Sequence, residues 1–161
     1  MGAAVIWAPG RPASDLDSRK SIFLAGPTNP TGEADWRESL TAALIELPIV
    51  IYNPKRTDWD STWKEDFSDS RWAEQVEWEL DMQDKADIVV VFFHRATLAP
   101  ISLLELGLCV RSGKAIVCAQ DGYSKRGNVE AVCRRYGAKF VDSEEDLQDA
   151  VRERLKQLIA E

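Results

Sequence analysis

The stretch ADIVVVFFHRATLAPISLLELGLCVRS, from Ala86 to Ser112, decides the fold. It begins with an apolar run that shows no alternation, which is typical of a strand buried on both faces of a parallel sheet. A short polar loop follows, and then an apolar segment that opens at Pro100 or Ile101 and ends before Gly113, the expected C-cap. A buried strand, a loop and a helix in this order predict one half of a β-α-β unit.

Outward from this stretch, apolar runs alternate with segments of helical periodicity. Strands are expected at residues 21–25, 49–52, 87–93, 115–119 and 139–141, with a short apolar run at 3–8, and helices at 34–46, 72–85, 101–112, 128–136 and from 143 onward. Five parallel strands with helices on both faces predict an α/β, three-layer, doubly wound, flavodoxin-like sheet. The length predicts a single domain over residues 1–161.

Composition narrows the function classes. The net charge is −7 and there is no basic tract, so nucleic acid and anionic membrane surfaces are not expected partners. No apolar run is long enough to span a bilayer, and no signal peptide is expected. The three cysteines, Cys109, Cys118 and Cys133, lie in apolar settings without metal-ligand spacing, so they are interpreted as buried thiols of a cytoplasmic protein.

Glu105 is the one ionisable residue inside the apolar helix that follows the central strand. A helix that is apolar on all sides is expected to be buried, and a carboxylate there is costly unless it is paired or has a chemical role. The first alternative is a structural ion pair with an arginine such as Arg111 or Arg56. The second is a catalytic carboxylate near the helix N-terminus, where the helix dipole favours the ionised form.

Glu79 is a second carboxylate in an unexpected place. In the helix expected at 72–85, Trp72, Val76 and Leu80 predict the inward face, and Glu79 lies within it, flanked by the polar amides of residues 75 and 83. The alternative is a helix placed one or two residues out of register. Two buried acids that open toward one edge of the sheet indicate glycoside chemistry, in which one carboxylate attacks an anomeric carbon and another group handles the leaving group's proton.

Several segments together resemble the nucleoside 2-deoxyribosyltransferase-like family. These segments run from residue 21 to residue 136: SIFLAGPT, NPKRTDWD, QVEWELDMQDKADIVVVFF, APISLLELGL, GKAIVC and GYSKRGNVEAVCRRYG. Members of this family cleave the N-glycosidic bond of nucleosides or nucleotides and transfer the sugar to another base or to water. The resemblance therefore implies an enzyme, a transferase or N-glycosidase of nucleotide metabolism, that needs neither metal nor cofactor.

The resemblance implies a role for particular residues. Glu105, in LLELG, matches the family's nucleophilic glutamate, and Glu79 matches a carboxylate that contacts the sugar or base. Apart from the resemblance, substrate contacts are expected from Asn53, Asp58, Asp60 and His94, because they belong to segments at the carboxyl ends of the strands. The resemblance adds Gly26, Pro27 and Thr28, in the loop that lies against the substrate. It also adds Asn128, in RGN, which is similar to an asparagine that some relatives supply from a neighbouring subunit. A homodimer or a larger homo-oligomer is expected on the same ground.

Two features depart from the family pattern. Family members often have a tyrosine in the first loop that orients the nucleophile, and Phe23, Leu24 and Ala25 offer none. The well-studied transferases place an Asp six residues before the nucleophile, where this chain has Ala99. Asp58 or Asp60 is a candidate for the missing carboxylate. The alternatives to base exchange are hydrolysis of a related ribosyl bond, such as nicotinamide–ribose in NAD, and a non-catalytic nucleotide-binding module. A Rossmann or P-loop site is not expected, because neither glycine motif is present.

Overall fold

A computed structural model describes residues 1–161, and its centre is a parallel sheet of six strands in the order β1-β3-β2-β4-β5-β6. The strands are β1 (Ala4–Trp7), β2 (Ser21–Ala25), β3 (Val50–Asn53), β4 (Ile88–Phe93), β5 (Ala115–Ala119) and β6 (Lys139–Val141). Every residue of β2, β3, β4 and β5 is buried, as expected for parallel strands covered on both faces. The predicted parallel α/β fold is confirmed.

The sheet has one strand more than the five predicted. The strands from β2 to β6 follow the flavodoxin-like order, and β1 adds to the edge, where Ala4 pairs in parallel with Val50 of β3. The short apolar run at residues 3–8 was expected as a possible strand outside that order. Three of its four strand residues are half-buried and Trp7 is exposed, so the sequence pattern alone does not place it in the sheet.

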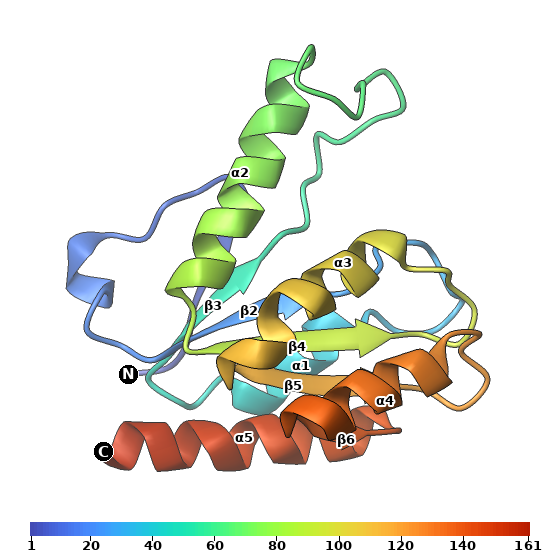
Figure 1. Cartoon of the computed structure of the whole chain (residues 1–161). Helices are drawn as coiled ribbons and strands as arrows, with labels where there is room; N and C mark the ends of the chain where they lie inside the picture. Colours follow the sequence, from blue (N-terminus) through green and yellow to red (C-terminus); the bar gives the residue numbers. More distant parts are fainter.

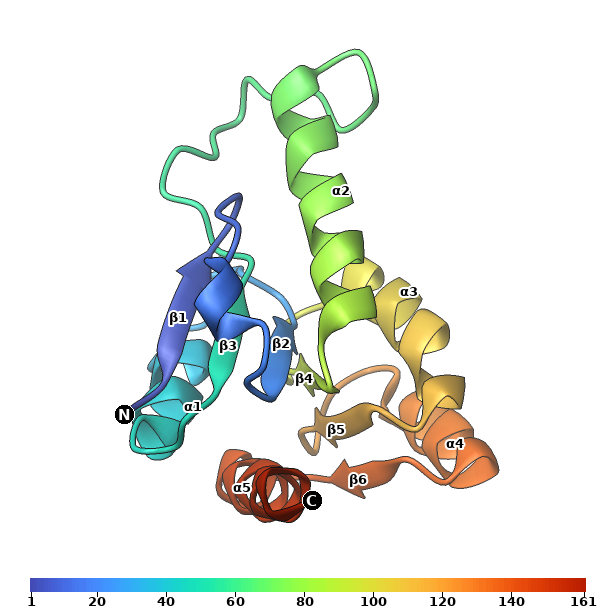
Figure 2. The ribbon, with the colours of Figure 1, turned by 90° about the vertical axis from the view of Figure 1, so that its left-hand side faces the viewer.

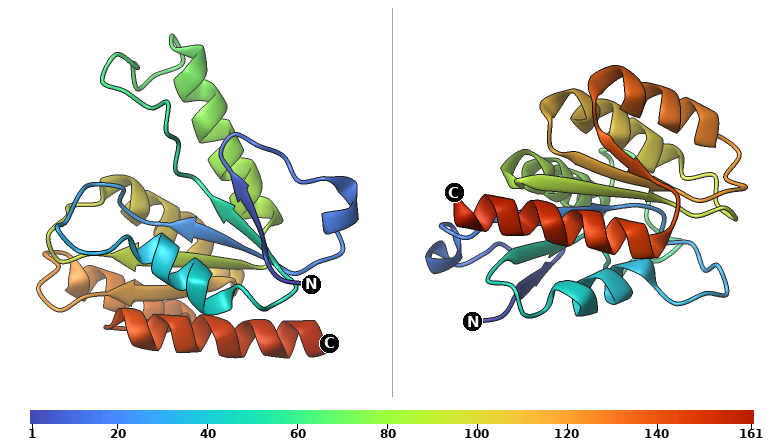
Figure 3. Two further views of the ribbon diagram at one scale, coloured as in Figure 1. Left: turned by 180° about the vertical axis from the view of Figure 1, so that it is seen from behind. Right: turned by 90° about the horizontal axis from the view of Figure 1, so that it is seen from below.

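Five α-helices cover the two faces of the sheet (Figure 2). Their bounds are α1 (Trp36–Leu44), α2 (Ser70–Lys85), α3 (Pro100–Cys109), α4 (Arg126–Tyr136) and α5 (Glu144–Ala160), with short 3-10 turns at Ser14–Leu16 and Val110–Ser112. One apolar cluster packs α1 and α5 against the sheet, and a second packs α2, α3 and α4 against the opposite face. The three-layer prediction is therefore confirmed, and both chain ends lie at the amino-end side of the sheet (Figure 3).

The N-terminal half of α2 stands out from the rest of the molecule, together with the loop at residues 54–69 (Figure 1). The face that α2 packs on the body carries Gln75, Trp78, Met82 and Gln83. The prediction that Trp72, Val76 and Leu80 face inward is wrong, because Leu80 is exposed and the other two are only half-buried. The extended helix meets the sheet near its C-terminal end, and at its other end Trp72 packs edge-on against Phe67 of the preceding loop, with ring centroids 5.2 Å apart.

The expectation that α3 is buried on all sides is also wrong. Ser102, Glu105, Leu106 and Cys109 face the interior, whereas Ile101, Leu104 and Leu108 are 60%, 62% and 59% exposed. A helix whose residues are almost all apolar shows little difference between its faces in sequence, so only packing decides which face is buried. Glu105 is nevertheless on the buried face, as predicted.

Candidate active site

Glu105 lies in the second turn of α3 and is 7% exposed. Its Oε2 accepts a hydrogen bond from Nε2 of Gln83 on α2, at 2.6 Å. The chain contains no ion pair to Glu105: Arg56 pairs with Asp58 and Glu74, and Arg111 lies over the ring of Tyr136. The structural ion-pair alternative is therefore wrong in the form in which it was expected.

Glu79 is half-buried on α2, four residues before Gln83 and four after Gln75. Its Oε2 accepts a hydrogen bond from Nε2 of Gln75 at 3.0 Å, and the same amide nitrogen donates to the carbonyl of Pro54 at 2.8 Å. Residues four apart share one face of a helix, so Gln75, Glu79 and Gln83 form a polar stripe. This stripe carries the second carboxylate and the amide that holds the first.

Burial acts on both carboxyl groups, and Glu79 also acts electrostatically on Glu105. Burial raises the pKa of Glu105 to about 8, with Glu79 as the next largest cause, while Arg37 and the Gln83 hydrogen bond oppose the increase. Burial also raises the pKa of Glu79, against the hydrogen bond from Gln75 and the charge of Arg37. Burial therefore disfavours the anion of both acids, and the charge of Glu79 disfavours the anion of Glu105 further.

Arg37 is the only cation whose charge acts on both glutamates. It is 2% exposed on α1, and its guanidinium donates to the carbonyl oxygens of Leu24, Gly26 and Pro27. Burial lowers its pKa to about 10, which leaves it charged at neutral pH. Arg37 therefore fixes the backbone where β2 passes into the first loop, and it supplies the site with one buried positive charge.

Gly26, Pro27 and Thr28 form the first part of that loop. A Cβ on Gly26 would lie 2.7 Å from Cζ2 of Trp36 and 3.0 Å from the carbonyl oxygen of Phe92, so only glycine fits there. Pro27 and Thr28 line a cavity of about 230 Å³, together with His94 and side chains of α1. Neither Glu105 nor Glu79 lines this cavity.

His94 ends β4 at the edge of the sheet and is buried. Its Nδ1 accepts from the backbone N–H of Ala96 at 3.0 Å, which makes Nε2 the protonated nitrogen of the neutral ring. Nε2 lies 2.7 Å from Oε2 of Glu33, whose other oxygen accepts from Arg95 at 3.1 Å. The hydrogen bond from His94 is the largest cause that lowers the pKa of Glu33. His94 thus ties the first loop to the end of the central strand.

The remaining predicted site residues lie in three places. Asn53 is buried at the end of β3, where its Oδ1 accepts from the backbone N–H of Lys55. Asp58 and Asp60 are exposed in the long loop, bound to Arg56 and Thr62, and neither is among the charges that act on the glutamates. Asn128 is exposed in the first turn of α4. The structure brings none of these three exposed residues to the glutamate pair.

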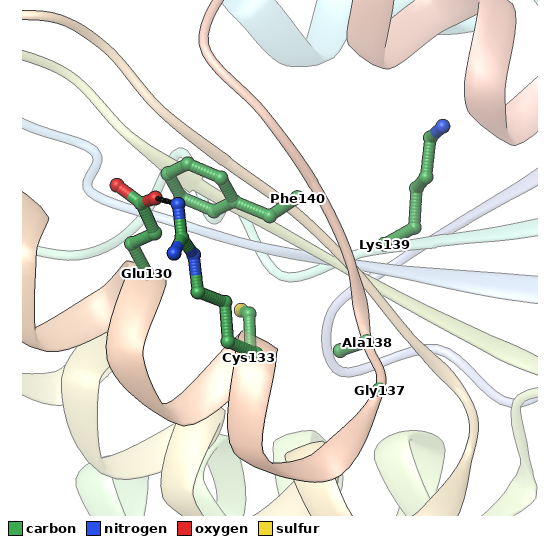
Figure 4. A pocket seen from close by; sticks show the side chains of 7 residues that line it. Glu130, Cys133, Gly137, Ala138, Lys139 and Phe140 are labelled. Carbon is green, nitrogen blue, oxygen red and sulfur yellow. Dashed lines mark ion pairs between the residues drawn. The ribbon is translucent and has the colours of Figure 1, made fainter.

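A larger hollow, of about 550 Å³, lies between α4 and β6 and is remote from these residues (Figure 4). It is lined by Gly137, Ala138, Lys139 and Phe140, by the buried thiol of Cys133, and by Glu130 and Arg134, which pair with each other at 2.5 Å. All three cysteines of the chain are buried free thiols, and burial raises the pKa of Cys133 to about 11. The hollow therefore presents no ionised nucleophile.

Sequence reasoning missed the role of Arg37 and Glu33, and it noticed Gln75 and Gln83 only as neighbours of Glu79. The sequence could have indicated Gln75 and Gln83 as neighbours of the carboxylate on one helix face, because each is four residues from Glu79. Arg37 has no such signal in the sequence: an arginine in the first turn of an amphipathic helix is usually exposed, and its burial follows from the carbonyls that surround it.

The fold and site together define a doubly wound α/β protein with a buried pair of carboxylates near the carboxyl ends of its central strands. Residues 19–123 match the family model described as nucleoside 2-deoxyribosyltransferase like, so the chain belongs to that family. No curated protein matches the chain. None of its helices combines the length and apolar character needed to cross a membrane.

Proposed function

We propose that this protein cleaves the N-glycosidic bond of a nucleoside or nucleotide and passes the ribosyl or deoxyribosyl group to another base or to water. The observation that carries the proposal is the buried pair Glu105 and Glu79, each held by a glutamine of the same α2 stripe. The family supports the substrate class, because its members are nucleoside 2-deoxyribosyltransferase-like proteins. The protein is thus proposed to be an N-glycosidase or transferase.

Glu105 is the proposed nucleophile. Its ionised carboxylate attacks the anomeric carbon, the bond between that carbon and the base nitrogen breaks, and the electron pair leaves with the base. The sugar then forms an ester with Glu105, and a second base or a water molecule releases it. Gln83 supports this role, because its N–H holds one carboxylate oxygen and leaves the other oxygen without a hydrogen bond in the chain.

Glu79 is the proposed second member of the pair. Burial raises the pKa of both carboxyl groups, so each of them holds a proton more readily than an exposed glutamate does. In the proposed reaction Glu105 attacks as the carboxylate, and Glu79 carries the proton that an ordinary leaving base requires. The negative charge of the ionised carboxylate also favours an oxocarbenium-like transition state, which is cationic.

Replacement of Glu105 tests this proposal. Glu105→Gln and Glu105→Ala should abolish base release from a panel of nucleosides and nucleotides, measured by chromatography, with circular dichroism unchanged. Glu77→Gln is the matched control, because Glu77 is exposed on α2 and its replacement removes the same charge. Wild-type turnover in Glu105→Gln would overturn the mechanism. A thermal shift with nucleosides in the absence of any base release would instead indicate a non-catalytic binding module.

We further propose a homodimer formed through α2 and α3. Leu98, Ile101, Leu104 and Leu108 expose a large apolar surface around α3, and Leu80 exposes another on α2, the helix whose Gln83 contacts Glu105. Apolar surface of this extent on two helices that meet at the site is typical of a protein–protein interface.

We also propose that the protein works in the cytoplasm. The three buried free thiols support this location, because thiols stay reduced there.

A further inference from the structure

The buried face of α2 has two edges, and a different part of the chain holds each of them. Gln83 lies along one edge and donates to Glu105 of α3 at 2.6 Å. Trp78, Asp81 and Lys85 lie along the other edge, because residues three and four apart share one side of a helix. The rotation of α2 about its own axis therefore decides how closely Gln83 approaches Glu105.

The N-terminal strap (residues 8–18) holds the second edge. The indole Nε1 of Trp78 donates to the carbonyl oxygen of Gly10 at 2.6 Å. Two ion pairs continue this contact along the helix: Arg11 with Asp81 at 2.8 Å, and Asp17 with Lys85 at 2.7 Å. The side chain of Trp78 is 1% exposed, whereas both ion pairs are exposed to solvent, so we expect the buried hydrogen bond to contribute most to this contact.

The acceptor of the Trp78 hydrogen bond is itself attached to the sheet. The backbone N–H of Ala8 donates to the carbonyl of Asn53, at the end of β3, at 3.0 Å, and the N–H of Gly10 donates to the carbonyl of Trp7 at 2.7 Å. A Cβ on Gly10 would lie 2.9 Å from that second carbonyl oxygen, so the turn is too tight for a larger residue. The carbonyl of Gly10 therefore offers Trp78 an anchor in a fixed position.

The contacts between these two edges do less to fix the rotation of α2. Phe23 of β2 packs against Trp78, with ring centroids 6.1 Å apart, and Gln75 donates to the carbonyl of Pro54 at 2.8 Å. Apolar packing is non-directional, so it resists the rotation of a helix less than hydrogen bonds do. Directional contacts at both edges therefore act together, and the loss of one should be felt at the other.

We propose that the N-terminal strap is a positioning element of the active site and that Trp78 is the positioning residue through which it acts: its hydrogen bond to Gly10 fixes the rotation of α2 and so holds Gln83 against Glu105. This inference rests on the proposed function, in which Glu105 is the nucleophile. The strap precedes the family match, which begins at residue 19. The chain thus sets the geometry of its active site partly with a segment that the family model does not include.

The ionisation of Glu105 reports on this coupling. When the hydrogen bond of Trp78 is lost, α2 can turn, and the hydrogen bond from Gln83 to Glu105 lengthens. The anion of Glu105 is then stabilised less, so its pKa rises beyond the increase that burial already causes. A general loss of stability has no such effect on the active folded protein.

Trp78→Phe in the full chain tests the strap, because phenylalanine keeps the aromatic packing and has no N–H. We expect kcat for base release at pH 7 to fall at least about threefold, and the acidic limb of the pH–rate profile to move up by at least about half a pH unit. Trp72→Phe is the matched control and should leave both in place, because Trp72 lies on the same helix and no hydrogen bond joins its indole to the strap.

Gly10→Ala changes the strap and leaves α2 itself intact. The new Cβ would lie 2.9 Å from the carbonyl oxygen of Trp7, so the turn must shift and the acceptor of Trp78 moves with it. The acidic limb should again move up. Gly10 is exposed, so this variant keeps the test available if Trp78→Phe does not fold. Gly127→Ala has open space around its Cβ and is the control.

A double-mutant cycle separates positioning from a loss of stability. If Trp78 acts through Gln83, then Trp78→Phe should move the acidic limb in the wild-type background and leave it unchanged in the Gln83→Met background. Equal shifts in both backgrounds would overturn the positioning role. Val151→Ala, in the core on the opposite face of the sheet, lowers Tm without touching α2 and should leave the profile in place.

The outcomes separate this inference from the function on which it rests. If Glu105→Gln abolishes base release while Trp78→Phe and Gly10→Ala both keep the wild-type pH profile, the strap has no positioning role and the proposed function stands. Absence of base release from the panel of nucleosides and nucleotides, or release that survives Glu105→Gln, would overturn the proposed function together with this inference.

Discussion

Gln83 and Glu105 meet across the α2–α3 contact, where the amide Nε2 of one donates to Oε2 of the other at 2.6 Å. Both side chains are buried, so the hydrogen bond stabilises the anion in a place where burial disfavours it. Gln83 thereby positions the carboxylate and helps to set the pH at which it ionises.

Gln83→Met should shift the pH dependence of base release. Methionine has a similar size and no N–H, so the anion of Glu105 loses a hydrogen bond and its pKa rises further. A hydrogen bond to a charged group contributes about 1.5–3 kcal/mol, so the acidic limb of kcat should move up by about one pH unit or more. The pH–rate profile measures this shift. The exposed Gln157→Met on α5 is the control and should leave the profile in place.

The raised pKa of Glu105 should make the protein less stable as the pH increases. Below about pH 4.5, the folded and unfolded chains both hold the proton, and the full stability is present. Between there and about pH 8, the unfolded chain gives up the proton while the folded chain keeps it, so the free energy of unfolding falls. Glu105→Gln should remove this pH dependence. At pH 8, its free energy of unfolding should exceed that of the wild type by about 1–3 kcal/mol.

Urea unfolding of both proteins at about pH 5 and pH 8 measures that difference. Circular dichroism follows the transition, and the change in slope with pH is independent of any activity. Equal pH dependence in the wild type and in Glu105→Gln would contradict the raised pKa.

Gly26→Ala should displace the first loop. The new Cβ would lie 2.7 Å from Trp36 and 3.0 Å from the carbonyl of Phe92, and neither the packed indole nor the strand backbone has room to move. Overpacking of this kind costs about 1–3 kcal/mol, measured as a lower Tm, and KM should rise because Pro27 and Thr28 move with the loop. Gly127→Ala has open space around its Cβ on α4 and should leave both quantities near their wild-type values.

Leu104→Lys should weaken the proposed homodimer. Leu104 is at the centre of the exposed stripe of α3, and a charge placed there must be desolvated when two copies associate. We expect the dimer dissociation constant from sedimentation to rise at least about tenfold. Ile159→Lys, on the exposed side of α5 at the opposite face of the sheet, is the matched control. A monomeric wild-type protein would contradict the proposal.

The sequence predicted the elements of the fold closely. The apolar run at β4 and the spacing of the other strands were sufficient for the parallel three-layer sheet, because a β-α alternation has few other solutions. Ser143 caps α5 as expected, with its Oγ accepting from the backbone N–H of Asp146. Both glutamates were also recognisable, since a charge within an apolar pattern is conspicuous without any coordinates.

The sequence by itself therefore determined the parallel sheet and marked Glu105 and Glu79 as candidates, because periodicity and misplaced charge are local properties of the chain. Only the tertiary structure decided which faces of α2 and α3 are buried, that β1 joins the edge of the sheet, and that Arg37 is buried among three carbonyls. It also decided that Gln83 holds Glu105. These features depend on how segments far apart in the sequence pack together, and local patterns do not encode the partner that each side chain finds.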